Sequence, residues 1–147
     1  MISNFLRNGD ADIFVHFTSG DATNAGQTGM ARFVPGDSVT GYVEITPAKN
    51  IAYKKLFLRI KWRTEGRGDT NEVVWYTVEE TDGNLTAGVT KTLPFSAVLP
   101  NEPWTFAGRY VCIVWGVDVE IDVAWAVNPR HFAPFVLAPA WSNPPER

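Results

Sequence analysis

The chain has 147 residues, a formal net charge of −3 and a sequence pI near 5.3, with 45% hydrophobic and 13% aromatic residues. A domain of this length buries roughly 68–70% of its unfolded surface, so this composition excludes a disordered chain and indicates one folded domain. The mildly acidic balance excludes a general nucleic-acid binder, whose surface would be basic.

In chain order, the first segments read as short strands. Apolar residues alternate over Ile13–Phe17, which predicts a strand. The turn Pro35–Asp37 then leads into a second strand over Val39–Ile45, which Pro47 closes. Gly and Pro, spread throughout the sequence, divide the chain into short pieces. This spacing favours an all-β protein.

The segment Ala48–Glu65, which contains no Gly or Pro, is open to two interpretations. A helix would place Leu58 and Trp62 on its charged side. A strand instead gathers an apolar face, made of Leu56, Leu58, Ile60 and Trp62. We therefore expect a strand, followed by a hairpin loop over Thr64–Asn71 and a returning strand over Val73–Glu79.

The strongest pattern lies between Tyr110 and Val127, where every odd position from Val111 onward is apolar. A period of two over this length predicts an extended strand, with a bend or bulge at Gly116. The even positions become acidic, and this acidic stripe consists of Asp118, Glu120 and Asp122. The stripe fits a calcium or acid–base site, but an outward row on a solvated strand is the favoured interpretation.

The C-terminal third also contains large apolar residues outside this strand. Trp104 and Phe106 precede Gly108, and we expect their rings to close one end of the core. Residues 132–137 add either a last Pro-flanked strand or, together with Trp141, a surface for self-association.

The elements together predict an all-β, immunoglobulin-like sandwich of two sheets, with no helix or one short helix. We expect an N-terminal extension over 1–9, the sandwich over 10–138 and a Pro-rich tail over 139–147.

Residues that carry chemistry are few. His16 and His131 show no metal-ligand spacing, and Cys112 lies inside the most apolar strand, where a thiol is usually inert. No phosphate-binding loop, nucleotide fingerprint or nucleophile elbow occurs. We therefore expect no enzyme, no metal and no cofactor. A single cysteine, and the lack of a signal-peptide or membrane-spanning apolar run, favour the cytoplasm.

Two candidate binding sites follow from the charges. The first is a basic face on the strand over 54–63, formed by Lys55, Arg59, Lys61 and Arg63. It fits recognition of an acidic or phosphorylated peptide or an anionic lipid, or simply pairing with the acidic stripe across strands. The second is the loop Arg67, Gly68 and Asp69, which spells the tripeptide that integrins recognise. Ordinary turn chemistry is the favoured interpretation of this loop.

Two stretches resemble the N-terminal lobe of the arrestin fold. Val34–Trp62 contains a Pro-Gly-acid turn, a strand with Gly two residues after its Val, and a second strand after a short connection. Leu93–Trp125 contains Pro-Phe, Leu-Pro, another Pro with an aromatic residue, a Gly and the long alternating strand. With the hairpin between them, the resemblance covers about residues 10–127.

The resemblance implies a non-enzymatic scaffold or adaptor that binds another protein, such as a membrane-protein tail. The first strand, Asp12–Thr18, lacks the adjacent lysines with which receptor arrestins sense phosphate. One sandwich is expected, because an arrestin needs a second lobe and only the Pro-rich stretch Asn128–Arg147 follows the long strand. Arrestin-like sandwiches also occur in the retromer cargo-sorting subunit and in bacterial sporulation-control proteins, so the resemblance does not determine the function. A sandwich that binds sugar or lipid through exposed Trp residues is the alternative, and a homo-oligomer is a further expectation.

Overall fold

The computed structural model describes residues 2–8, 10–21, 30–68, 70–124 and 126–139, with the backbone alone for 2–8. These residues form ten strands and no helix. The strands are β1 (Ile2–Asn8), β2 (Ala11–Phe17), β3 (Arg32–Phe33), β4 (Ser38–Pro47), β5 (Ile51–Gly66), β6 (Glu72–Leu85), β7 (Lys91–Val98), β8 (Phe106–Ala107), β9 (Val111–Asp122) and β10 (Arg130–Leu137).

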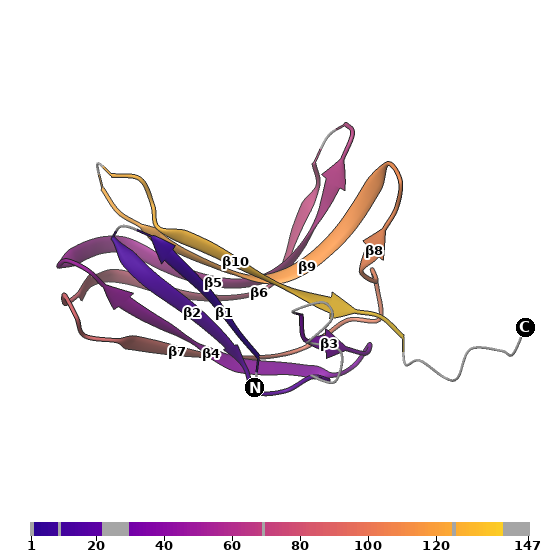
Figure 1. The fold of residues 1–147 in the computed structure, drawn as a ribbon, viewed down its shortest axis with the longest axis horizontal. Coiled ribbons are helices and arrows are strands. Elements are labelled where there is room, and N and C mark those ends of the chain that lie inside the picture. The colour runs from indigo at the N-terminus through magenta and orange to yellow at the C-terminus, as the bar shows by residue number, and fades with distance from the viewer. Residues whose placement is uncertain (1, 9, 22–29, 69, 125, 140–147) are drawn as a thin grey trace, which may run out of the picture.

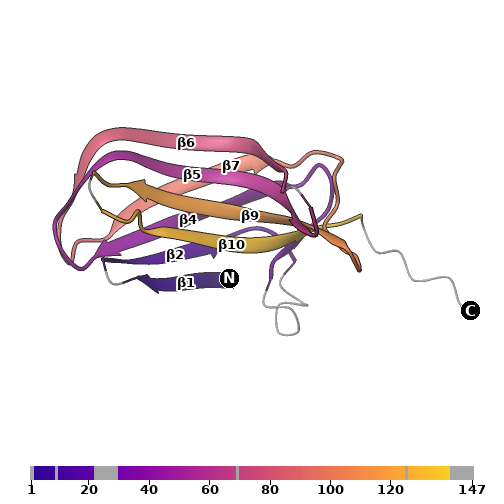
Figure 2. The same ribbon diagram turned by 90° about the horizontal axis from the view of Figure 1, so that it is seen from above.

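Two sheets pack face to face, so the expected all-β sandwich is confirmed (Figures 1 and 2). The smaller sheet has the order β1-β2-β4-β7, and the larger has the order β3-β10-β9-β5-β6 with β8 added beside β9. Residues 2–8, expected as an extension, pair with β2 as strand β1. Residues 132–137 belong to β10, which pairs with β9, and Trp141 lies outside the described residues.

Alternation of apolar and polar residues determines which side chains enter the core. In β2 the buried positions are Ala11, Ile13, Val15 and Phe17, and each residue between them is only half-buried. The same period is seen in β5, whose Leu56, Leu58 and Ile60 are fully buried. The strand interpretation of residues 54–63 is therefore confirmed, and β5 extends to Gly66, beyond the expected start of the hairpin loop.

The long strand predicted to reach Val127 is too long by five residues. β9 ends at Asp122, and Val127 is 88% exposed. The chain must turn here because β10 runs antiparallel to β9. Asn128 stabilises the turn, since its Oδ1 accepts a hydrogen bond of 3.0 Å from the backbone N–H of Val123.

Of the bend or bulge expected at Gly116, the bulge lies instead on the neighbouring β5–β6 hairpin. Both ladders of β9 pass through Gly116 without a shift, whereas the β5–β6 ladder shifts between Ile60 and Lys61. The extra residue is Trp75, which has no partner in the register. Gly116 serves packing, because an added Cβ would lie 2.3 Å from the ring of Phe132.

The expectation that Trp104 and Phe106 close the core is wrong, since they are 49% and 54% exposed. Trp115 of β9 fills this position and is fully buried. Its indole N–H donates a hydrogen bond of 2.8 Å to the carbonyl of Pro103, which satisfies the polar atom of a buried ring.

Candidate functional site

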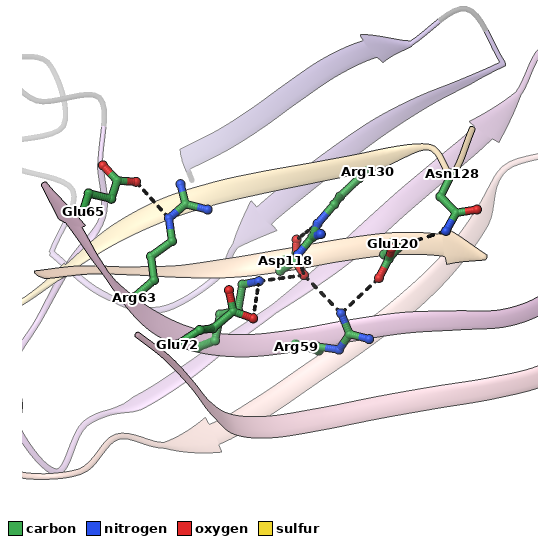
Figure 3. Close-up of polar contacts among 9 residues, drawn as sticks. Arg59, Arg63, Glu65, Glu72, Asp118, Glu120, Asn128 and Arg130 are labelled. Atoms are coloured by element: carbon green, nitrogen blue, oxygen red, sulfur yellow. Dashed lines mark hydrogen bonds and ion pairs between the residues drawn. The ribbon is translucent and has the colours of Figure 1, made fainter. Parts of the chain in front are cut away.

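A charged cluster lies on the outer face of the larger sheet, the side turned away from the core. Asp118 of β9 is at its centre, and its carboxylate is only 1% exposed. Arg130 of β10 donates two hydrogen bonds of 3.0 Å to this carboxylate, and Arg59 of β5 lies 3.4 Å from it (Figure 3). Arg59 also lies 3.1 Å from Glu120, the next outward residue of β9.

Lys61 is the most unusual member of this cluster, because its side chain is fully buried on an outward-facing strand position. Its Nζ lies 3.0 Å from Glu72 of β6 and 3.2 Å from Asp118. Both contacts are ion pairs, but neither has the geometry of a hydrogen bond. A buried ammonium without its carboxylates would be very costly, so Lys61 depends on these two residues.

The environment of Asp118 determines its protonation. Burial by itself would raise the pKa of this carboxyl group, but the hydrogen bonds from Arg130 and the charges of Lys61 and Arg130 outweigh burial. The pKa of Asp118 is therefore lowered, and the group is ionised at neutral pH. Three cations (Arg59, Lys61, Arg130) face three carboxylates (Glu72, Asp118, Glu120), so the cluster is balanced in charge.

Each of the four residues of the predicted basic face has a carboxylate partner. Lys55 pairs with Glu79 at 3.0 Å, and Arg63 pairs with Glu65 at 2.8 Å. Arg59 and Lys61 belong to the cluster around Asp118 described above. Binding of an anion by this face stays a prediction, and a ligand would have to displace a carboxylate that is already in place.

The larger sheet bends away from the smaller one at the end that holds the β5–β6 turn and β8 (Figure 1). We define the projecting end as Trp62–Gly66, Glu72–Val74, Phe106–Ala107 and Val111–Ile113. Directly opposite residues of paired strands share a face, so Val73, Trp62 and the buried Trp115 lie on the core-facing side. Phe106 of β8 stands opposite Ile113 of β9, which is on the same face as Trp115, so Phe106 also lies on the core-facing side.

No strand of the smaller sheet covers this side at the projecting end (Figure 1). Val73 and Val111 are therefore 42% and 41% exposed, although they continue the core-facing rows of β6 and β9. Phe106 is still more exposed. Single exposed apolar residues are ordinary on a protein surface. Several of them on one side of the same sheet end are typical of an interaction site.

The loop that contains Arg67 and the loop that contains Tyr110 meet at the far end of the projecting end, which we call the tip. The backbone N–H of Arg67 donates a hydrogen bond of 3.2 Å to the carbonyl of Tyr110. Gly66 has a positive φ of 146°, and a Cβ there would lie 2.2 Å from this carbonyl oxygen. The close approach of the loops therefore requires glycine. Of the predicted loop site, Arg67 and Gly68 are exposed, and Asp69 lies outside the described residues.

Two of the tryptophans bear on the sugar- or lipid-binding alternative. Trp75 and Trp104 are about half exposed, and both donate their indole N–H to a backbone carbonyl, of Val98 and Asn101 respectively. Neither N–H is therefore free for a ligand hydroxyl. The sugar- or lipid-binding alternative stays a prediction.

Within the described part of the chain, no group of three His, Cys, Asp or Glu residues has the arrangement of a metal site. Cys112 is a free thiol, half-buried. Burial lowers the pKa of His131, although the charge of Asp118 opposes this shift. The part that the structure describes also has no helix long and apolar enough to cross a membrane.

Two features of this surface were missed in the sequence. Arg130 follows the predicted strand, and nothing in the sequence indicated its partner. In the structure the β9–β10 turn places Arg130 beside Asp118. Tyr110 was treated only as the start of the long strand and Arg109 was not considered, although the preceding Gly108 was a signal for a loop.

No family model matches the sequence, and no curated protein matches it. Among solved structures, the fold is similar to that of Spo0M, a sporulation control protein from Bacillus subtilis, with a TM-score of 0.63 and 14% sequence identity. The match covers 91% of this chain and 51% of the Spo0M chain, so this chain spans about half of its neighbour's length. The arrestin-like sandwich expected from the two sequence stretches is thereby confirmed as a fold.

Proposed function

We propose that this protein is a non-enzymatic binding module of arrestin-like type, and that it holds another protein at its projecting end. The observation that carries the proposal is the uncovered core-facing side, where Val73, Phe106 and Val111 are 41–54% exposed. Aromatic residues, together with arginine, are enriched in the centres of protein interfaces.

The arrangement of the functional groups agrees with a binding role. The buried cluster around Asp118 is balanced in charge, and each of its cations is paired with a carboxylate. Catalysis by a nucleophile or a general base needs a reactive group near a substrate site. The free thiol Cys112 is compatible with the reducing cytoplasm, which we include in the proposal.

Capture of partners by the 147-residue chain tests the proposal. The wild type, a Val73→Lys, Val111→Lys variant and a Val127→Lys control would be compared, with captured proteins identified by mass spectrometry. Val127 is a matched control because it is 88% exposed and lies in the β9–β10 turn, away from the projecting end.

We expect a partner that the wild type and the control capture and the double variant loses. The partner's identity, whether a membrane-protein tail, another protein or a second copy of this chain, would come from the same experiment. Equal capture by all three proteins, or no reproducible capture by the wild type, would show that the projecting end is not a binding surface.

A further inference from the structure

The cations of the larger sheet fall into two groups. On its outer face, Lys55, Arg59, Lys61, Arg63 and Arg130 each lie within 3.4 Å of a carboxylate oxygen. At the tip, Arg67 and Arg109 are exposed and have no carboxylate partner among the described residues. With Asp69 counted from the sequence, the two tip loops still contain more arginines than carboxylates.

The two unpaired arginines lie beside one aromatic ring. The guanidinium carbons of Arg67 and Arg109 are 5.9 Å and 5.4 Å from the ring centroid of Tyr110. Tyr110 itself is 59% exposed. A guanidinium next to an aromatic ring keeps N–H donors available at its edge, where they can bind a carboxylate in a bidentate manner.

These arginines adjoin the uncovered apolar side of the projecting end. Tyr110 precedes Val111, which stands opposite Gly66 in the register, and Phe106 stands opposite Ile113 two residues further along β9. One extended ligand could therefore contact the apolar row and the arginines together. The projecting end as a whole combines Arg, Tyr and Phe, the residue types enriched in protein interfaces.

We propose that the tip binds an acidic segment of a partner protein, in which an apolar or aromatic side chain is followed by carboxylates. The apolar side chain lies against Phe106 and Val111, and the carboxylates bind Arg67 and Arg109. This proposal rests on the proposed function, because it specifies the chemistry of the partner at the same projecting end.

The order of the groups along the projecting end favours a polypeptide over a membrane. A segment that enters a membrane places its apolar groups deeper than its cations. Here Arg67 and Arg109 lie in the loops at the tip, and Val73, Phe106 and Val111 lie on strands nearer the body. Insertion of the tip into a bilayer would therefore bury the two charges first.

Selection of random displayed peptides on the immobilised 147-residue chain tests this proposal. We expect the selected peptides to carry Asp or Glu close to an aromatic or aliphatic residue. A synthetic selected peptide would then be titrated against the wild type, Arg67→Glu, Arg109→Glu, the double variant and Lys54→Glu. Lys54 is a matched control because it is exposed, without an ion-pair partner among the described residues, and at the opposite end of β5.

We expect each arginine reversal to weaken binding about tenfold, the size of effect typical of losing a charge-assisted hydrogen bond, and Lys54→Glu to change it less than about twofold. Replacing Glu by Gln in the peptide should weaken binding to the same extent. Selected peptides without acidic residues, no enrichment, or equal binding to the double variant would overturn the proposal.

Two further outcomes separate this proposal from the proposed function. If a captured partner needs Val73 and Val111 but not Arg67 and Arg109, the projecting end binds protein and the acidic chemistry is wrong. Vesicles containing phosphatidylserine form the last arm. Binding of these vesicles by the wild type, lost in the double variant while no peptide is selected, would assign the tip to a membrane and overturn the proposal.

Discussion

On the outer face around Asp118, three cations and three carboxylates neutralise one another, and Lys61 and Asp118 are almost completely buried. At the projecting end of the same sheet, the arginines of the tip lack carboxylate partners among the described residues, and apolar side chains are exposed. The difference separates a region whose polar groups contribute to structure from one whose groups remain available to a ligand. A count of basic residues along β5 does not make this distinction.

The largest expected effect comes from breaking the balanced region. Asp118→Ala leaves the buried Lys61 and the two neighbouring arginines without their central carboxylate, and we expect a loss of about 3–5 kcal/mol in the free energy of unfolding. Urea denaturation measures this loss. Asp122→Ala, on the same strand and face, should cost less than about 1 kcal/mol, and equal losses would show that the cluster is not special.

The second comparison uses one residue type on one strand. Val119→Ala removes fully buried methyl groups and should cost about 2 kcal/mol, whereas Val111→Ala, at a position 41% exposed, should stay within about 0.5 kcal/mol. Thermal and urea unfolding of both variants provide the test. A large loss for Val111→Ala would mean that the projecting end is covered in the folded protein, contrary to the proposed binding surface.

The third prediction concerns pH and the core-facing His131. Burial favours its neutral form, so the folded-state pKa is lower than the unfolded value of about 6.5. The contribution of His131 to the free energy of unfolding is complete above about pH 6.5 and decreases as the pH falls below it. We expect a slope of up to about 1.4 kcal/mol per pH unit below about pH 6, and His131→Leu should remove that part of the slope.

Urea unfolding between neutral and mildly acidic pH measures this difference. Identical pH dependence in the wild type and in His131→Leu would contradict the assignment to His131.

The smallest effect is expected at an exposed pair of the outer face. Lys55 and Glu79 are 49% and 38% exposed, so Lys55→Ala should cost about 0.2–1 kcal/mol, and less at high salt. A double-mutant cycle with Glu79→Ala measures the coupling. A coupling as large as the loss in Asp118→Ala would remove the contrast between buried and exposed charges.

The sequence was most informative where a period of two continued without interruption. The apolar rows of β5 and β9 follow directly from alternation, and so does the outward position of Lys55, Arg59, Lys61 and Arg63. Their pairing with acidic residues was one of the two interpretations considered. What the pattern could not reveal is how deeply Lys61 and Asp118 are buried, since that depends on neighbouring strands.

The partner of Lys61 illustrates the limit of the pattern. Regular alternation along β6 would place Glu72 on the same side as Tyr76 and Val78, toward the core. The extra residue Trp75 reverses the alternation, so Glu72 stands opposite Arg63 on the outer face and reaches Lys61. The turn before Arg130 could not be recognised from the pattern either, because the apolar period continues to Val127 after the strand has ended.

The extra residue in β6 has a consequence for changes in chain length. Because Trp75 has no opposite residue, deleting it would leave the pairs Tyr76 with Ile60 and Val74 with Lys61 in place. A one-residue deletion from the facing stretch of β5 would increase the mismatch instead. Single deletions should therefore be tolerated on one side of this hairpin and not on the other, and a deletion scan would reveal the asymmetry.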